Sequence, residues 1–444
     1  MSEGKGKRVD LNAVSDKFTE EVLAGILAEV CKSEGEVRLI DWSFDEGFAK
    51  GDYFTSSINK GSVSGVVGGK LGQRRRVQAN FVVKAMPKNP RRRKTMRSAD
   101  FFRNEIVFYT EVASRFKKFL ADKGQSHLLS IPRYLASFTD GENDFLVLED
   151  ASRLGFGPAS RRSCLDLTEC TVILKTMAKF HAISFAHKDQ REEEFAEIVS
   201  HLREIFFGKD YWDGFKNYHK NLLDVARHAL NSEYPGSEAE RCFNSYRFGA
   251  LYDKCAELCG RKNAPTSVVC EGDCWPPNFL VRDVGGAGLK EALMLDFQIS
   301  RCASPVTDLS FLIYSCTDKT FRDQHFDDML KIYHSELSDG VKSLGSDPER
   351  VYPWNLFLKE VKEQFFFGLF ASLEIIPLSL LEVSPSIDLD DKFLDDEDVD
   401  LSEAVKFFNI ETASGRRRLA DMIVHAVDCG FLPYADNFQA SSKT

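Results

Sequence analysis

Patterns typical of β-strands are concentrated in the first 150 residues, whereas patterns typical of helices fill most of the remainder. Short apolar runs such as 37–42 and 77–84 alternate with glycine-containing segments, which favours strands joined by turns. Beyond residue 150, apolar residues mostly recur at spacings of three and four, as they do along the buried face of a helix. Strands first and helices afterwards are typical of the α+β class.

Two helices are also expected within the strand-rich part. An amphipathic helix lies in residues 1–33, and a longer one covers 101–119, where apolar residues fall on one side. The segment 61–76 contains five glycines and is predicted to connect two strands. The basic run 88–97, which includes a proline, is predicted to be a solvated link between a strand and the second helix.

The helical remainder contains one β section, over 267–297. Before it, Asp166 is a predicted helix N-cap, because a glutamate follows three residues later. The helix behind this cap is predicted to bury one face, made up of Leu167, Cys170, Leu174, Met177 and His181. Further helical segments are predicted at 202–207, 248–258, 365–383 and 417–427. The acidic run 388–400 is expected to be a solvated loop.

Composition and charge exclude several classes of protein. The chain has 444 residues, enough for two or three domains, and a net charge of −10 at pH 7, which argues against a nucleic-acid binder. The 11 scattered cysteines are expected to be reduced thiols of a cytoplasmic protein. The first seven residues are polar, and no apolar leader follows them, so no signal peptide is expected. The most apolar stretch, 365–383, contains two glutamates and a proline and is barely long enough to span a membrane, so it is predicted to be a buried helix and turn.

The β section at 267–297 is the most informative segment. A buried strand leads into the turn Glu271-Gly-Asp273, and Asn278 opens a second strand that returns, after a glycine-rich turn, to end at Asp296. In an antiparallel hairpin, the first residue of one strand lies beside the last residue of the other. Asn278 and Asp296 are therefore predicted to meet at one edge of the hairpin, with Asp273 on the adjacent loop.

Two carboxylates and a carboxamide at one edge offer the oxygen ligands that Mg²⁺ prefers. Phosphoryl transfer needs an oriented hydroxyl nucleophile and a cation that spreads charge on the phosphates. Asp273 is therefore a candidate for orienting an acceptor hydroxyl and taking its proton, and Asn278 and Asp296 are candidate metal ligands. The same residues also fit a simple polar turn, because an aspartate and an asparagine at this spacing are common.

The strand-rich part contains a second pair of charged residues that fits the same chemistry. Lys84 ends a predicted strand, and Glu105 follows 21 residues later in the predicted helix at 101–119. Protein kinases hold the α- and β-phosphates with a strand lysine that is paired to a helix glutamate. Each residue alone is ordinary, but the two in this order, upstream of the β section, favour a nucleotide site.

Together these elements resemble the ecdysteroid-kinase-like family, also called CHK-kinase-like, within the kinases related to aminoglycoside and choline phosphotransferases. The resemblance covers residues 51 to 432. It rests mainly on Gly272-Asp-Cys-Trp275 and Asp296-Phe-Gln298, which are specific to this group. Weaker matches are Gly51-Asp-Tyr-Phe-Thr-Ser56, Val82-Val-Lys84, Asn104-Glu-Ile-Val-Phe-Tyr109, Leu148-Glu-Asp150, Ala178-Lys-Phe-His-Ala182, Asp308-Leu309 and Tyr333-His334.

The resemblance implies a bilobal protein-kinase-like fold, with a β-rich N-lobe at 1–149 and a mainly helical C-lobe at 150–444. It implies ATP and Mg²⁺ as cofactors, Asp273 as the catalytic residue, and Asn278 and Asp296 as metal ligands. The nucleotide contacts that it implies are Lys84, Glu105, Gly51 and Ser56, with the hinge residues Leu148, Glu149 and Ala151. A structural role is implied for Asp308.

The partner that the resemblance implies is a small hydroxylated acceptor, and an ecdysteroid or a similar apolar compound is the expected substrate. Aromatic residues in the segments 211–218 and 365–370 are candidate walls of its pocket, although core packing also accounts for most of them. The sequence indicates no oligomeric state.

Glu271 departs from the family pattern His-Gly-Asp, because it stands in the histidine position. A glutamate there adds negative charge beside Asp273 and Asp296, so a nucleotide-binding pseudokinase stays open as an alternative. A choline- or ethanolamine-type kinase is a second alternative.

Two other readings are disfavoured. A protein kinase is disfavoured because His-Arg-Asp, Asp-Phe-Gly and Ala-Pro-Glu are missing from the sequence. A zinc site is disfavoured because three residues, rather than the usual two, separate the members of each candidate cysteine pair. These pairs are Cys255 with Cys259 and Cys270 with Cys274.

Overall fold

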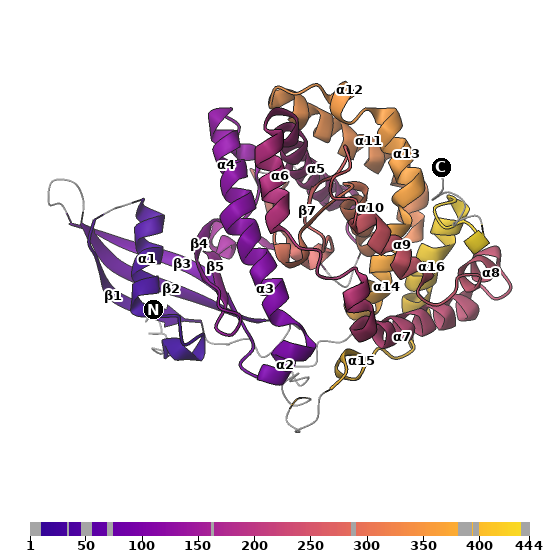
Figure 1. The fold of residues 1–444 in the computed structure, drawn as a ribbon, viewed down its shortest axis with the longest axis horizontal. Coiled ribbons are helices and arrows are strands. Elements are labelled where there is room, and N and C mark those ends of the chain that lie inside the picture. Colours follow the sequence, from indigo (N-terminus) through magenta and orange to yellow (C-terminus); the bar gives the residue numbers. More distant parts are fainter. Residues whose placement is uncertain are drawn as a thin grey trace. The chain divides into compact units, whose positions relative to one another are not determined.

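The computed structural model describes residues 10–32, 35–45, 56–68, 74–160, 164–285, 290–380, 393 and 399–436. These residues form two compact units (Figure 1). Unit 1 is drawn from 1–109, 131–156 and 383–399, and unit 2 from 110–130, 157–382 and 400–444. The first unit is built on a β-sheet and the second is mainly helical, so the predicted α+β class is confirmed. The domain boundary between residues 149 and 150 stays a prediction.

Unit 1 is built on a five-stranded antiparallel sheet in the order β1-β2-β3-β5-β4. The strands are β1 (Val37–Phe44), β2 (Ser57–Gly68), β3 (Arg74–Ala85), β4 (Tyr134–Phe138) and β5 (Phe145–Glu149). Helix α1 (Glu20–Cys31) lies across one face of the sheet (Figure 1) and buries Leu23, Ile26 and Leu27 in the core of the unit. The predicted strands at 37–42 and 77–84 are confirmed, whereas no sequence pattern predicts β4.

The five-glycine segment joins two strands as predicted, but most of it lies within the strands themselves. Residues 61–68 belong to β2, and β3 begins at Arg74, while 69–73 lie outside the described residues. Gly61 pairs with Phe81 of β3, and a Cβ at Gly61 would come within 2.6 Å of the Phe81 ring. Glycine here allows close packing inside a strand rather than a turn.

The predicted helix at 101–119 is present, but it is longer and not uniform. It consists of α3 (Ser98–Val107), the π-helical turn η2 (Phe108–Val112) and α4 (Ala113–Asp122). The preceding basic run is not a solvated link as predicted. It forms a short helix, α2 (Pro90–Thr95), which is capped by the Asn89 side chain and buries Arg92.

Unit 2 consists mainly of helices and carries short strands. Its helices before the β section are α4, α5 (Leu167–Gln190), α6 (Glu192–His201), α7 (Lys209–Glu233), α8 (Glu238–Asn244) and α9 (Ala250–Cys259). Those after it are α10 (Val306–Cys316), α11 (Lys319–Ser343), α12 (Pro348–Val351), α13 (Trp354–Gln364), α14 (Phe366–Leu380), α15 (Leu401–Ala404) and α16 (Ala413–Asp428). The helices predicted at 248–258 and 417–427 are thus confirmed.

The helix cap predicted before α5 is confirmed, because the Asp166 carboxylate accepts a hydrogen bond from the backbone N–H of Glu169 at 2.8 Å. The predicted buried face is right except at Leu167, which is 42% exposed. The helix predicted at 202–207 is wrong. The Glu204 side chain accepts hydrogen bonds from the backbone N–H groups of Phe206 and Phe207, and this local turn replaces a helical one.

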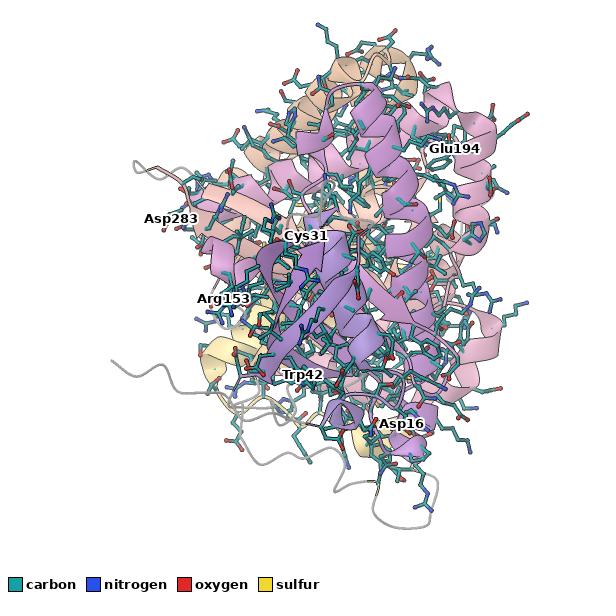
Figure 2. The ribbon with its side chains drawn as sticks, turned by 90° about the vertical axis from the view of Figure 1, so that its left-hand side faces the viewer. Asp16, Cys31, Trp42, Arg153, Glu194 and Asp283 are labelled. Carbon is teal, nitrogen blue, oxygen red and sulfur yellow. The ribbon has the colours of Figure 1, made fainter. Side chains whose placement is uncertain are left out.

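The β section of unit 2 forms two small antiparallel sheets. One pairs β7 (Val268–Cys270) with β10 (Arg301–Ala303), and the other contains β8 (Phe279–Asp283) between β6 (Gly157–Pro158) and β9 (Lys290–Met294). Asp283, at the end of β8, is exposed at the surface (Figure 2). The expected hairpin is therefore present, and it carries the candidate site residues at its opposite end.

The apolar stretch at 365–383 is a buried helix, α14, over its described part. Among the described residues, no single helix combines the length and the apolar character needed to cross a membrane. Residues 348–364, together with α14, meet both criteria only as a pair, which is bent by 51°. Most of the acidic run 388–400 lies outside the described residues.

Helix α14 crosses α10 at the closest contact found for any described glycine. A Cβ at Gly368 would lie 2.1 Å from the backbone carbonyl of Ser310. Gly368→Ala is therefore expected to force the two helices apart and to destabilise the protein by about 1–3 kcal/mol, measured as a lower thermal unfolding temperature. The control is Gly214→Ala in α7, where a Cβ meets nothing within 4 Å. An equal effect of both substitutions would contradict this account.

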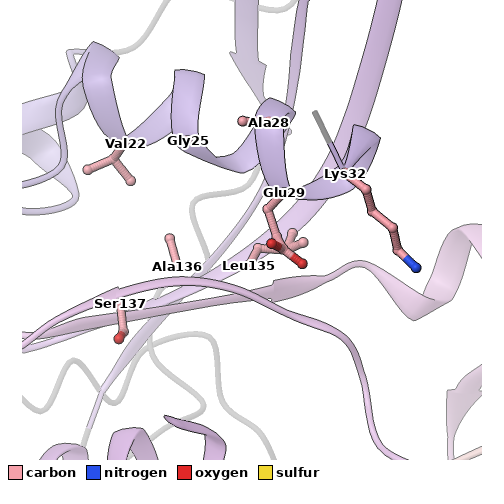
Figure 3. A pocket seen from close by; sticks show the side chains of 8 residues that line it. All are labelled: Val22, Gly25, Ala28, Glu29, Lys32, Leu135, Ala136 and Ser137. Carbon is pink, nitrogen blue, oxygen red and sulfur yellow. The ribbon is translucent and has the colours of Figure 1, made fainter. Parts of the chain in front are cut away.

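A shallow hollow of about 550 Å³ lies in unit 1 between α1 and β4. Val22 and Ala28 line its helix side, Leu135 and Ser137 line its strand side, and Lys32 lies at one end (Figure 3). None of the predicted site residues lines this hollow, so it takes no part in the candidate active site.

Candidate active site

The predicted pair of Lys84 and Glu105 is formed within unit 1. Lys84 lies near the end of β3, between Ile58 of β2 and Leu146 of β5, and Glu105 is on α3. The Lys84 Nζ atom donates a hydrogen bond to Glu105 Oε2 at 2.7 Å, and both side chains are largely buried. The glutamate thus fixes a desolvated ammonium at the end of the central strand.

The other predicted nucleotide contacts in unit 1 are described only in part. Gly51 lies outside the described residues, whereas Ser56 is buried just before β2. In the predicted hinge, Leu148 and Glu149 end β5 and Ala151 opens the 3-10 helix η4 (Ala151–Leu154). The N–H of Glu149 donates to the carbonyl of Arg133 within unit 1. Contact of the hinge with adenine stays a prediction.

In unit 2, the loop that carries Asp273 is held by hydrogen bonds from its backbone to the Asp308 side chain. One Asp308 oxygen accepts a hydrogen bond from the N–H of Glu271 at 2.7 Å, and the other accepts one from the N–H of Gly272 at 3.1 Å. Gly272 has φ +93, and a Cβ there would lie 2.3 Å from the carbonyl oxygen of Ile299. Asp308 therefore fixes a turn that only glycine can form.

Asp308 is itself held by a buried histidine. The His181 ring nitrogens contact Asp308 Oδ2 at 3.2 Å and the Tyr333 hydroxyl at 2.6 Å, and all three residues are buried. His181 was predicted to be a core residue; it is, and it also joins α5, α10 and α11 beneath the loop. The sequence pattern alone places His181 on a buried face but does not reveal these partners.

Asn278 and Asp296 meet at the end of the hairpin, as the strand geometry predicts. Phe279 pairs with Met294, and the N–H of Leu295 donates to the carbonyl of Asn278 at 2.8 Å. Asp296 follows directly and has a left-handed backbone conformation, with φ 59. A non-glycine residue in this conformation is costly and is enriched at functional sites.

The Asp273 carboxylate is oriented by two side-chain amides. Asn278 Nδ2 donates to Asp273 Oδ2 at 3.1 Å and to the Asp273 carbonyl at 2.9 Å, and Gln298 donates a further hydrogen bond. Burial, followed by the negative charges of Asp296 and Glu374, raises the pKa of Asp273 to about 7. A carboxyl group with a pKa near neutrality is suited to accept a proton.

The donor set fits a divalent cation. The Asn278 amide nitrogen is committed to Asp273, which leaves its Oδ1 oxygen as the atom to face a metal. Asp296 is partly exposed and lies next to Asn278 across the hairpin. A carboxylate and an amide oxygen are ligands that Mg²⁺ accepts, together with water and phosphate oxygens.

Glu271, which stands in the family's histidine position, is fully buried. Its Oε2 atom accepts a hydrogen bond from the N–H of Asp273 at 2.9 Å. Burial, and then the charges of Asp273 and Asp308, raise the pKa of Glu271 well above its usual value. The neutral carboxylic acid is therefore favoured, so Glu271 adds less negative charge to the site than the sequence suggests.

Glu271→Gln is expected to keep turnover within about threefold of the wild type, because a neutral amide preserves the hydrogen bond to the Asp273 N–H. Glu271→Ala removes that bond and is expected to lower turnover about tenfold. Steady-state turnover with Mg²⁺ and ATP measures both. If Gln were as harmful as Ala, the side chain would have to act as an ionised carboxylate.

The four cysteines of the disfavoured zinc reading are all buried, and they take part in local contacts. The Cys270 thiol contacts the carbonyl of Ala303, and the Cys274 sulfur contacts the Met177 sulfur. Cys255 and Cys259 lie on α9, and burial raises the pKa of both thiols well above its usual value. Raised pKa values oppose the thiolate form that zinc binds.

The sequence model of the ecdysteroid kinase-like family matches residues 50–346, about two thirds of the chain. The chain belongs to the ecdysteroid kinase-like family. The predicted resemblance is thus confirmed, and the matched range includes every predicted site residue. As a member of this family, the chain is a small-molecule kinase, that is, a phosphotransferase that acts on an alcohol hydroxyl.

Solved kinase structures are similar to this ecdysteroid kinase-like protein. Choline kinase LicA from Streptococcus pneumoniae is 12% identical over 81% of this chain and 98% of its own, with a TM-score of 0.34. A microcompartment-associated aminopropanol kinase is 11% identical over 90% and 94%, with a TM-score of 0.38. Wild-type aminoglycoside 2′-phosphotransferase-IIIa, in its GDP complex, is 12% identical over 80% and 98%, with a TM-score of 0.32. At these values no residue role is transferred, and no curated protein matches the sequence.

Proposed function

We propose that this ecdysteroid kinase-like protein transfers the γ-phosphate of ATP, with Mg²⁺, to a hydroxyl of a small apolar acceptor. The observation that supports this most directly is the Asp273 carboxylate, oriented by Asn278 beside Asp296 at the open end of the hairpin. An oriented proton acceptor next to a pair of hard oxygen ligands is what phosphoryl transfer to an alcohol requires.

Each predicted site residue takes a definite part in this proposal. Asp273 orients the acceptor hydroxyl and takes its proton as the oxygen attacks the γ-phosphorus. The bond from the γ-phosphorus to the β,γ-bridging oxygen breaks, and ADP leaves with that oxygen. Asn278 Oδ1 and Asp296 would hold Mg²⁺, which when bound spreads the charge of the phosphates. Lys84, steadied by Glu105, would contact the α- and β-phosphates.

The remaining nucleotide contacts in the proposal come from unit 1. The loop from Gly51 to Ser56 would cover the phosphates, and the backbone of Leu148, Glu149 and Ala151 would meet the adenine. All 11 cysteines are free thiols, which supports the further proposal that the enzyme works in the reducing cytoplasm.

An ecdysteroid or another apolar alcohol is the proposed acceptor, and aromatic side chains of unit 2 support this choice. The Trp212 ring packs against the Tyr252 ring at a tilt, with 4.7 Å between ring centroids. Phe248, at 5.3 Å from Trp212, is 43% exposed. By contrast, Phe365, Phe366 and Phe367 of the predicted wall at 365–370 are buried in the core. The first of the two predicted wall segments is therefore the better candidate.

The test is an acceptor screen with purified protein, ATP and Mg²⁺, read by mass spectrometry for phosphorylated product. The panel contains ecdysteroids, other hydroxylated lipids, choline and ethanolamine. A phosphorylated ecdysteroid or lipid is expected, and product from choline or ethanolamine alone would favour that type of kinase instead. No product from any acceptor, with nucleotide binding intact in a thermal-shift assay, would favour a pseudokinase. The residue that raises this alternative is Glu271, which stands in the family's histidine position.

A further inference from the structure

Glu374 and Tyr218 form a hydrogen-bonded pair that the proposed mechanism does not use. Glu374 lies on α14 and Tyr218 on α7. The Tyr218 hydroxyl donates to Glu374 Oε1 at 2.8 Å. Tyr218 is buried, with 3% of its surface exposed, whereas Glu374 is partly exposed. The pair therefore has a buried member, Tyr218, and a partly exposed member, Glu374.

Glu374 is tied to the catalytic loop through α10. Helix α14 packs on α10 at Gly368, against the backbone of Ser310. Two residues of α10 in turn hold the loop. The Asp308 carboxylate accepts hydrogen bonds from two backbone N–H groups of the loop, and the Ser315 hydroxyl donates one to the carbonyl of Cys274. The position of Glu374 relative to Asp273 is thus set by packed helices within one unit. The two carboxyl groups are close enough for the charge of Glu374 to raise the pKa of Asp273.

The second oxygen of Glu374 is available to a ligand. Within the described part of the chain, Oε1 has Tyr218 as its partner and Oε2 has no hydrogen bond. No positively charged side chain of the described residues acts on this carboxyl, and burial raises its pKa to about 6. A partly desolvated carboxylate without a cation is costly unless a binding partner brings it a hydrogen-bond donor.

We propose that Glu374, held by Tyr218, determines acceptor specificity by accepting a hydrogen bond from a second polar group of the acceptor. This second group, a hydroxyl or an ammonium, lies next to the hydroxyl whose proton Asp273 takes. Acceptors with two adjacent donor groups are therefore preferred over simple alcohols. The proposal rests on the proposed function and adds to it the kind of acceptor that the site selects.

Specificity of this kind predicts a large discrimination against a substrate that lacks the second polar group. Without that group, the Glu374 Oε2 atom is left without a hydrogen-bond donor when the substrate is bound. Three matched probes differ only in that group: 1,2-propanediol, 1-amino-2-propanol and 2-propanol. Each is used with ATP and Mg²⁺, and kcat/KM is measured by ADP release. The wild type is expected to favour at least one of the first two over 2-propanol by about 10–100-fold. The better of the two identifies the donor as hydroxyl or ammonium.

The variants test whether Glu374 is the cause. In Glu374→Gln, the discrimination ratio is expected to fall at least fivefold, mainly through a higher acceptor KM. Tyr218→Phe, which frees the carboxylate from its support, is expected to lower the same ratio less. The matched control is Tyr234→Phe, which removes another tyrosine-carboxylate hydrogen bond of unit 2, to Asp421, and is expected to keep the wild-type ratio.

The outcomes separate this inference from the proposed function. If the wild type phosphorylates the probes or an acceptor of the screen, and Glu374→Gln and Tyr218→Phe both keep the wild-type ratio, the inference is wrong while the kinase assignment stands. If the wild type transfers phosphate to no alcohol, the proposed function and the inference both fail. A fall in thermal stability without a change in the ratio would show that the pair is only a tie between α7 and α14.

Discussion

Asp273→Asn is expected to lower turnover of the acceptor by about 10²–10⁴-fold, because it removes the group that is proposed to take the hydroxyl proton. Asparagine has nearly the same shape as aspartate, so the loop held by Asp308 should stay folded. Nucleotide binding should therefore persist. Turnover is measured with ATP, Mg²⁺ and an acceptor from the screen, and nucleotide binding is measured by thermal shift.

The matched control for this prediction is Asp283→Asn on the same hairpin. Its side chain is 80% exposed and pairs only with Lys290 among the described residues, so the substitution should leave turnover at the wild-type level. If Asp273→Asn kept more than a tenth of wild-type turnover, Asp273 could not be the proton acceptor. A loss of nucleotide binding and thermal stability together would instead indicate a folding defect.

Lys84→Met is expected to have the second large effect, on activity and on stability together. Loss of the ammonium removes the proposed phosphate contact and should lower kcat/KM for ATP by about 10²–10³-fold. It also removes the ion-pair partner of the buried Glu105, and breaking a buried ion pair costs about 3–5 kcal/mol. The thermal unfolding temperature should therefore fall as well.

A double variant separates the two consequences of losing Lys84. Lys84→Met with Glu105→Gln also removes the negative charge that Lys84 neutralised, so it should recover much of the lost stability without recovering turnover. Lys88→Met is the control, because Lys88 has an exposed side chain whose polar contacts among the described residues are the Asn12 carbonyl and Asp16. Turnover that returned together with stability in the double variant would mean that Lys84 only stabilises unit 1.

Local patterns were sufficient wherever the chemistry depends on neighbours in the chain. Strand pairing rules brought Asn278 beside Asp296, and the N-cap at Asp166 followed from one side chain and one N–H group. The same reasoning failed at Gly61, because the partner that requires a glycine there is Phe81 in another strand. It failed again at 202–207, where the Glu204 side chain competes with the helix for backbone N–H groups.

Distant contacts gave the site the properties that no spacing in the sequence reveals. Gln298 belonged to a recognised motif, yet its hydrogen bond to Asp273 appears only when the loop after β9 folds back. Glu271 looked like an added charge, and burial beside Asp273 and Asp308 favours its neutral form instead. Glu374 lies in an apolar stretch and belongs to no motif that would indicate a functional role. Only the packing of α14 brings it near Asp273.

The sequence by itself determined the fold class, the family and the identity of the catalytic and metal-binding candidates. These depend on residue type and on short spacings, which local hydrogen bonding and side-chain periodicity translate directly into structure. Only the tertiary structure decided the raised pKa of Glu271, the support of the loop by Asp308 and His181, and the approach of Glu374 to Asp273. Desolvation and charge-charge interactions act through space, so their strength is fixed only when helices far apart in the chain are packed together.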